Sequence, residues 1–294
     1  MNYQLKNEEL VVNMDTFGAE MTSIKDRNMK EYMWCGDKKY WGRHSPVLFP
    51  IVGRLKDDKY VYEGKEYNMG QHGFARDMEF RCINHTDGEV WFALEANEDT
   101  LYKYPFNFKL EIGYKLVNNN IKVIWKVTNM EKEKAMHFSI GAHPAFLCPI
   151  DSESDKTAYS ILMNGDDKVF YYFLNPQNGL LCDKEHELKL EHGNHRLEEG
   201  FFDTSAYIIE NSQVNSVSLV KPNGKAYITV KFDAPLVGIW SPEKKDAPFV
   251  CIEPWYGRCD KENFEGTLEQ REWGNTLNPG EVFERAYVIS VLAE

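Results

Sequence analysis

Three short segments place residues that can exchange protons among aromatic residues, glycine and proline. They are residues 71–76 (QHGFAR), 141–146 (GAHPAF) and 251–257 (CIEPWYG). A charged side chain in such a setting is either solvated at a loop tip or gathered into a cleft with distant parts of the chain. Two histidines, a carboxylate and a guanidinium among aromatic walls would bind a polar, ring-shaped ligand and move its protons. The segments therefore suggest an enzyme that handles sugars.

Glu253 has apolar neighbours on both sides, residues 250–252 (VCI) and 254–255 (PW). An ionised carboxylate that is buried without a partner is costly, so two interpretations remain open. Either Glu253 pairs with an arginine such as Arg258 at the rim of a sheet, or desolvation raises its pKa from about 4.3 toward neutrality. In the second case Glu253 is a competent general base.

Two histidines and two arginines share this kind of setting. Pro144 favours an extended backbone at His143, so the imidazole leaves the end of a strand in a defined direction. A histidine in this place can equally be a structural hydrogen-bonding residue. His72 precedes a Gly-Phe pair where the chain must turn, and Arg76 could reach the same cleft. Arg54 follows an apolar run shaped by glycine and proline, which is unusual for a solvated surface residue.

Composition narrows the possible partners. The chain has 294 residues, of which 43% are hydrophobic and 27% charged, as is ordinary for a soluble globular protein. The net charge of −12 argues against nucleic-acid binding. Residues 1–9 lack the features of a signal peptide, and no stretch approaches the roughly 20 apolar residues of a membrane span. We therefore expect a cytoplasmic protein with neither nucleic acid nor membrane as a partner.

Cofactor and metal motifs are missing from the sequence. His72, His143 and Glu253 could ligate a metal, but they show no HxH or HExxH spacing. The six cysteines contain no CxxC pair. There is no GxSxG nucleophile motif, no phosphate-binding glycine-rich loop and no dinucleotide fingerprint. We therefore expect neither a catalytic metal nor a cofactor.

The periodicity of apolar residues predicts strands along most of the chain. Residues 108–116 and 121–127 alternate with period two on either side of the asparagines at 118–120, which predicts a hairpin. One short helix is expected over residues 98–104, stopped by Pro105. The hairpin pattern recurs at three further polar turns, residues 63–65, 164–165 and 222–224.

No linker, charge block or change in composition divides the chain. The polar stretch at 149–156 predicts a long loop rather than a domain boundary, and strand patterns continue to residues 287–291. We therefore predict one domain over residues 1–294 with an all-β fold. The expected architecture is a large antiparallel β-sandwich of two packed sheets, too big to be immunoglobulin-like.

Four motifs, in their order and spacing, resemble those of the aldose 1-epimerases (mutarotases). They are residues 49–54 (FPIVGR), 71–77 (QHGFARD), 141–146 and 251–257. The resemblance covers nearly the whole chain and points to the LacX-like branch, which is related to the hexose-6-phosphate epimerases. It implies the galactose mutarotase-like β-sandwich and a cofactor-independent interconversion of the α and β anomers of an aldose.

The resemblance also implies a role for individual residues. Glu253 matches the general base that takes the proton from the anomeric hydroxyl, and His143 matches the general acid that protonates the ring oxygen. His72 and Arg54 match sugar-binding residues, and Arg76 matches the basic residue of the second motif.

Two further sugar contacts are expected. Trp255, beside the predicted base, offers an aromatic face for the sugar. The family often carries a sugar-binding Asp in a segment like residues 201–208 (FFDTSAYI). Here Ser205 falls at the expected position and Asp203 lies two residues earlier, so Asp203 remains a candidate for that role.

The expected partner is a small-molecule sugar, bound by a monomer or homodimer. Arg54 and Arg76 leave a hexose 6-phosphate open as substrate. A phosphate site usually gathers several cations and the other motifs add only Arg258, so we favour unphosphorylated sugars. A sugar-binding protein without turnover is a further alternative, disfavoured because binding alone needs no matched acid and base. A glycoside hydrolase would generally need a second carboxylate.

Overall fold

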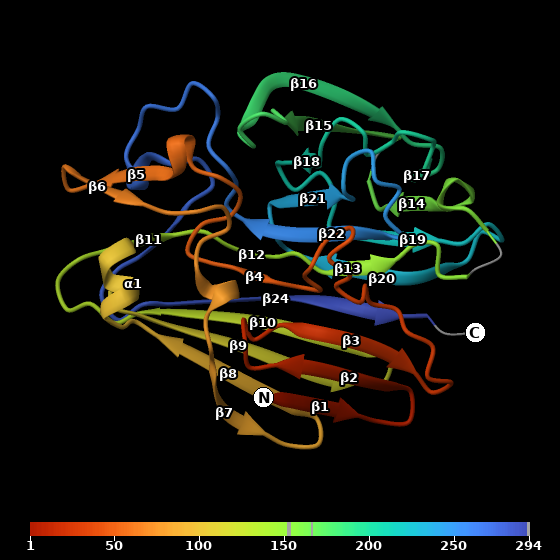
Figure 1. The fold of residues 1–294 in the computed structure, drawn as a ribbon, viewed down its shortest axis with the longest axis horizontal. Coiled ribbons are helices and arrows are strands. Elements are labelled where there is room, and N and C mark those ends of the chain that lie inside the picture. The colour runs from red at the N-terminus through yellow and green to blue at the C-terminus, as the bar shows by residue number, and fades with distance from the viewer. Residues whose placement is uncertain (152–153, 166, 293–294) are drawn as a thin grey trace.

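The computed structural model describes residues 1–151, 154–165 and 167–292, and two large β-sheets dominate it (Figure 1). Every pairing between named strands is antiparallel. One sheet has nine strands, which are in spatial order β17 (Asn194–Arg196), β14 (Ser160–Met163), β19 (Ser216–Val220), β20 (Ala226–Phe232), β24 (Val282–Val291), β10 (Asn120–Asn129), β9 (Phe108–Val117), β8 (Glu89–Glu95) and β7 (Arg81–His85).

The second sheet has eight strands. In spatial order they are β16 (Leu181–Lys189), β15 (Lys168–Leu174), β18 (Tyr207–Ile209), β21 (Leu236–Trp240), β22 (Phe249–Tyr256), β12 (Ile140–Ala142) and β4 (Val47–Leu48), with β13 (Ala145–Leu147) also paired to β22.

Smaller elements surround the two sheets. A three-stranded sheet packs on the nine-stranded one, with the ring of Tyr3 lying 5.4 Å from that of Phe92. It consists of β1 (Asn2–Lys6), β2 (Leu10–Asp15) and β3 (Met21–Asp26). The remaining elements are the pairs β5 (Lys59–Tyr62) with β6 (Lys65–Asn68) and β11 (Met136–Phe138) with β23 (Asn275–Leu277), the helix α1 (Glu98–Lys103), and the 3-10 turns η1 (Lys56–Asp58), η2 (Ala75–Asp77), η3 (Lys156–Ala158) and η4 (Leu268–Gln270). Among the described residues, no helix is long and apolar enough to span a membrane.

The two large sheets pack face to face, as the alternating sequence pattern predicted. Tyr256 of β22 meets Trp125 of β10 edge to face, with ring centroids 6.1 Å apart. Both rings lie in one apolar cluster that runs through the molecule. Burial of an aromatic or large aliphatic side chain contributes about 1.5–3 kcal/mol, so this shared core fixes one sheet against the other. The predicted antiparallel β-sandwich is confirmed.

Most of the predicted turns are correct, and one is wrong. The hairpins β9–β10, β5–β6 and β19–β20 form where expected, and α1 lies within the predicted helix. The turn at residues 164–165 is not a hairpin, because β14 belongs to the nine-stranded sheet and β15 to the eight-stranded sheet. The Asn164 side chain accepts a hydrogen bond from the backbone N–H of Asn215, which anchors the chain at this crossing. Part of the predicted loop at 149–156 lies outside the described residues.

Strand β22 is buried on both faces, and this explains its continuous apolar run. Val250 and Ile252 join the core between the sheets. Glu253 shares the opposite face with Cys251 and Trp255, because side chains alternate along a strand. That opposite face carries the polar groups described next.

Candidate active site

A gap in the strand pairing places His143 opposite Glu253. Gly141 of β12 pairs with Trp255, and Ala145 of β13 pairs with Cys251. The short connection between these two strands therefore passes Glu253, and it contains His143. The Pro144 carbonyl accepts a hydrogen bond from the Ile252 N–H at 3.2 Å, which ties the connection to β22.

Trp255 closes one side of this gap. A Cβ atom added to Gly141 or Gly238 would lie 2.5 or 2.6 Å from the indole of Trp255, so the ring can lie flat only because both neighbours are glycine. Its Nε1–H donates to the Ala142 carbonyl at 3.2 Å. Trp255 is 5% exposed. It therefore forms a fixed wall beside Glu253 and offers little face to a ligand.

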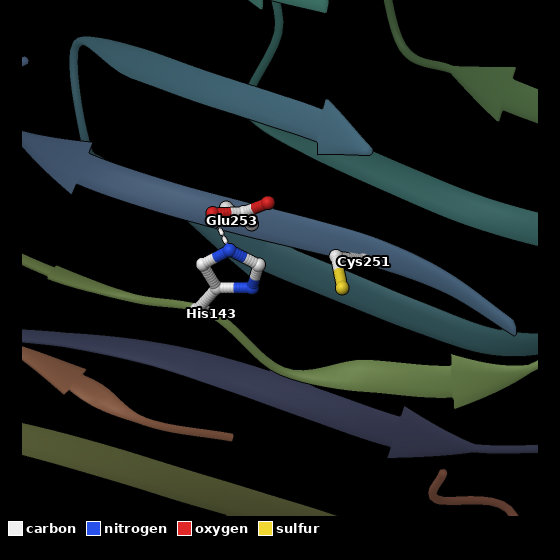
Figure 2. A group of neighbouring side chains, drawn as sticks. All are labelled: His143, Cys251 and Glu253. Carbon is white, nitrogen blue, oxygen red and sulfur yellow. Dashed lines mark ion pairs between the residues drawn. The ribbon is translucent and has the colours of Figure 1, made fainter. Parts of the chain in front are cut away.

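Glu253 and His143 form a buried acid–base pair. Their Oε2 and Nε2 atoms are 3.2 Å apart (Figure 2), although the contact lacks the alignment of a hydrogen bond. Burial raises the pKa of Glu253 well above its usual value of 4.5, with the Trp255 indole acting weakly in the other direction. Burial also lowers the pKa of His143 from 6.5 to about 3, and the nearby charges of Arg76 and Arg43 add to this effect.

Each pKa shift disfavours the charged form of its group, so burial favours a pair that holds one proton between its two members. Because the two groups are in contact, that proton belongs to the pair and can reside on either member. A pair that keeps one mobile proton can both accept and donate. This is the requirement for general acid–base catalysis of a proton exchange.

Aromatic rings pack around His143. Trp41 stacks on the imidazole with ring centroids 4.7 Å apart, and Trp240 meets it edge to face at 5.4 Å. Trp41 belongs to a loop over residues 35–46, and its carbonyl accepts a hydrogen bond from Trp34 Nε1. Both tryptophans are partly exposed, so they can present rings to a bound sugar. Neither was predicted from the sequence, because neither lies in one of the motifs.

His72 lies beside His143 as a neutral donor. Its ring lies 5.6 Å from that of His143. The Gly53 N–H donates to its Nδ1 at 3.1 Å, which leaves the ring proton on Nε2. Burial lowers the pKa of His72 well below 6.5, helped by His143 and Arg76. The structure places His72 beside His143, and its predicted contact with the sugar stays a prediction.

Two arginines bring positive charge to this group. Arg76 donates to the Gln71 carbonyl at 2.6 Å, and its pKa falls to about 10 because it is buried and lies near Arg43. Arg43 forms an ion pair with Asp77 at 2.8 Å. Arg43 comes from the same loop as Trp41 and was not predicted. No local motif marks it in the sequence, because the loop's approach to His143 depends on tertiary contacts.

One carboxylate fixes the end of that loop. Glu20 accepts hydrogen bonds from the backbone N–H groups of His44 and Ser45 at 2.6 and 2.8 Å. These contacts hold the segment that carries Trp41 and Arg43.

Two of the predicted site residues do not join this group within the described part of the chain. Arg54 donates from Nε and Nη2 to the two carboxylate oxygens of Asp58, both at 2.7 Å. Asp203 lies on an exposed loop and lines a separate cavity of about 800 Å³ with Lys156. The Ser205 hydroxyl accepts from the Leu174 N–H at 3.1 Å and so supports a strand. The predicted sugar contacts of Arg54 and Asp203 stay predictions.

Arg258 is not the partner of Glu253. It forms a buried ion pair with Glu210 at 2.5 Å and a second ion pair with Glu272. The structural interpretation of Glu253, as half of an arginine pair at the sheet rim, is therefore wrong. The contact that Glu253 makes is with His143.

One cluster contains the types of atom that bind metals. His143, Cys251 and Glu253 are all buried, and one ligand atom from each lies within 4.8 Å of the others (Figure 2). This is the single such group among the described residues. It overlaps the acid–base pair.

The fold defines the class of this protein. The galactose mutarotase related enzyme of Lactobacillus acidophilus superimposes with a TM-score of 0.93 and 36% identity, covering 100% of this chain and 98% of that one. A galactose mutarotase-like protein of Lactobacillus casei ATCC 334 superimposes with a TM-score of 0.92 and 29% identity, covering 99% and 100%. The chain therefore has the galactose mutarotase-like β-sandwich.

Sequence comparison narrows the class to a family. The family model "Aldose 1-epimerase" matches residues 1–290. The plasmid LacX protein of Lactococcus lactis subsp. lactis is 32% identical over 299 residues, covering 99% of this chain and 100% of that protein. The chain belongs to the aldose 1-epimerase family, as its four motifs predicted. Membership of this family and the mutarotase-like neighbours support a carbohydrate epimerase or mutarotase.

Proposed function

We propose that this protein is an aldose 1-epimerase that interconverts the α and β anomers of a hexose without a cofactor. The observation that carries the proposal is the buried pair of Glu253 and His143, 3.2 Å apart, with tryptophan rings beside it. Glu253 takes the proton from the anomeric hydroxyl, and His143 gives a proton to the ring oxygen.

The distance between the two groups suits this chemistry. The anomeric hydroxyl and the ring oxygen are bonded to the same carbon, so two neighbouring protein groups can reach both atoms. One proton leaves the sugar to Glu253 while another arrives from His143, and the ring opens to the aldehyde. Rotation about the C1–C2 bond and closure on the other face then reverse both transfers. Each proton transfer contributes about 10²–10⁴-fold to the rate.

The other residues bind and orient the sugar in this proposal. His72 donates its Nε2–H to a sugar oxygen, since its Nδ1 is already occupied by the Gly53 N–H. Trp41 and Trp240 exclude water and contact the apolar face of the ring. Exclusion of water strengthens the electrostatic interactions of the acid–base pair.

Polarimetry tests the proposal. Freshly dissolved α-D-glucose and α-D-galactose should reach their equilibrium rotation faster with the enzyme than with buffer alone. If no hexose is accelerated, while calorimetry still detects sugar binding, the protein is a sugar-binding protein on this fold and the proposed activity is incorrect.

A hexose-6-phosphate 1-epimerase is the second candidate, favoured by one specific observation. Arg43 and Arg76 both lie close enough to His143 to lower its pKa, so one more cation lies near the acid–base pair than the motifs indicated. Guanidinium groups suit phosphate oxygens. The test is the ratio of kcat/KM for glucose 6-phosphate over glucose, in wild type and in Arg76→Ala. A ratio well above about ten that collapses in the variant establishes the phosphorylated substrate. A ratio near one in both excludes it.

A further inference from the structure

Cys251 lies beside the acid–base pair but has no part in the proposed epimerisation. It is two residues from Glu253 on β22 and fully buried, and it projects from the same face of the strand (Figure 2). One ligand atom from each of Cys251, Glu253 and His143 lies within 4.8 Å of the other two. Sulfur, carboxylate oxygen and imidazole nitrogen are the three ligand types that zinc sites use.

The distances suit a tetrahedral ion. With Zn–N and Zn–O bonds of about 2.0–2.2 Å, a tetrahedral angle puts the two ligand atoms about 3.3 Å apart. His143 Nε2 and Glu253 Oε2 are already 3.2 Å apart. With a Zn–S bond of about 2.3 Å, the sulfur would lie about 3.6 Å from the nitrogen or oxygen. The largest distance between two ligand atoms in the cluster is 4.8 Å at most. It would have to shorten by about 1.2 Å when the ion binds.

Two atoms of this cluster lack hydrogen bonds. His143 Nδ1 and Glu253 Oε2 are buried and have no hydrogen-bond partner in the described part of the chain. A buried polar atom without a partner is costly, so a cation that bonds to such a carboxylate oxygen recovers part of that cost.

The net charge of the complex also suits a buried site. A divalent cation, one thiolate, one carboxylate and one neutral imidazole sum to zero, and a neutral group avoids the cost of burying charge. The thiol and the carboxyl must lose their protons when the metal binds. The charge of the ion drives this loss of protons, because a coordinating thiol is deprotonated by the metal itself.

From this geometry we propose that His143, Cys251 and Glu253 bind one thiophilic divalent cation, Zn²⁺ or Cd²⁺, and that the bound ion inhibits the enzyme. The ion occupies both groups that move protons, so it competes with the sugar. The inhibitory part rests on the proposed function, whereas the binding part does not. The site is distinct from a catalytic metal centre, because the acid and the base are themselves the ligands.

Binding is measured first, without any sugar. Equilibrium dialysis with Cd²⁺ gives the affinity, and the ultraviolet thiolate-to-cadmium band shows whether sulfur is a ligand. All proteins carry serine at Cys35, Cys82 and Cys182, because these thiols are exposed or partly exposed. The test variant is Cys251→Ala, and the matched control is Cys148→Ala, which removes another buried thiol.

The parent protein and Cys148→Ala should bind one equivalent of Cd²⁺ with the thiolate band. Cys251→Ala should lose the band and bind at least about tenfold more weakly, since even outer-shell partners of metal ligands are worth about 10–100-fold. His143→Asn, which keeps the thiol, should also weaken binding by at least about tenfold. An unchanged band and affinity in Cys251→Ala, or full affinity in His143→Asn, overturns the proposal.

Inhibition is measured second, by polarimetry. Zn²⁺ should inhibit the parent protein, excess sugar should protect it, and EDTA should restore the rate. In Cys251→Ala the half-inhibiting Zn²⁺ concentration should rise at least about tenfold. Equal inhibition of parent and variant overturns the inhibitory role. If no aldose is turned over, the proposed function fails, and the dialysis experiment still decides whether the metal site exists.

Discussion

Replacement of Glu253 by glutamine should stabilise the folded protein at neutral pH, although it removes the proposed base. Burial raises the pKa of the Glu253 carboxyl above its usual 4.5. The folded state therefore keeps a proton that the unfolded state has already lost. A carboxyl of this kind stabilises the protein only at low pH, and stability falls as the pH rises from 4.5 toward the folded pKa. Glutamine has nearly the same shape and does not titrate, so the variant avoids this loss.

The size of the effect follows from proton linkage. A difference of one bound proton changes the free energy of unfolding by about 1.4 kcal/mol per pH unit. Between about pH 5.5 and about pH 7.5, the difference in stability should therefore shift in favour of the variant, with about 1.4 kcal/mol per pH unit as the upper limit. For a domain of this size, 1 kcal/mol corresponds to about 2–4 °C in Tm.

The assay is urea unfolding of both proteins at three pH values across that range. The stability difference should grow steadily with pH in favour of Glu253→Gln. A difference that does not change with pH would refute the reasoning, because it would mean that Glu253 is ionised in the folded state. Glu210→Gln is the matched control. Glu210 is buried but paired with Arg258, so its replacement removes one of the two carboxylates that pair with this buried guanidinium and should destabilise the protein.

Three further outcomes are expected. Glu253→Gln and His143→Asn should each lower kcat by at least about 10²-fold with folding intact, and near wild-type mutarotation in either variant would remove that residue from the mechanism. The pH–rate profile should show no break near 6.5, because a second proton joins the pair only as the pH falls toward about 3, the pKa of His143; a break near 6.5 would show that His143 is not desolvated. EDTA should leave the rate unchanged, and a loss that zinc restores would point to a catalytic metal.

Much of the fold could be predicted from the sequence because many of its elements are specified by residues that are close together in the chain. The β9–β10 hairpin follows from period-two alternation around a polar turn, and α1 from a polar start and a proline stop. The turn at residues 164–165 looks the same locally and yet crosses between sheets. Whether this turn forms a hairpin depends on which distant strands β14 and β15 pair with. The alternation of residues along one strand does not specify the partner of that strand.

Some residues of the candidate site could likewise be predicted from local motifs, and others could not. Glu253, His143 and His72 stand in motifs whose glycine, proline and tryptophan neighbours shape the backbone, so their types and order were informative. Trp41 and Arg43 lie near His143 on a loop whose end is fixed by Glu20, about 25 residues before that end in the chain. A contact at that separation depends on the folded arrangement of the strands, which periodicity does not reveal.

The way this chain buries its carboxylates supports a functional role for Glu253. Glu210 is buried with Arg258, and Asp260 with Arg271. Each guanidinium supplies charge and hydrogen bonds that offset the cost of desolvation. Glu253 is buried more deeply, at 1% exposed against 8% for Glu210 and 5% for Asp260. It contacts a neutral histidine instead of a guanidinium, and its own Oε2 atom has no hydrogen bond. A stable core would gain from replacing such a carboxylate, so its presence beside His143 is best explained by the proton transfers that the two groups can perform together.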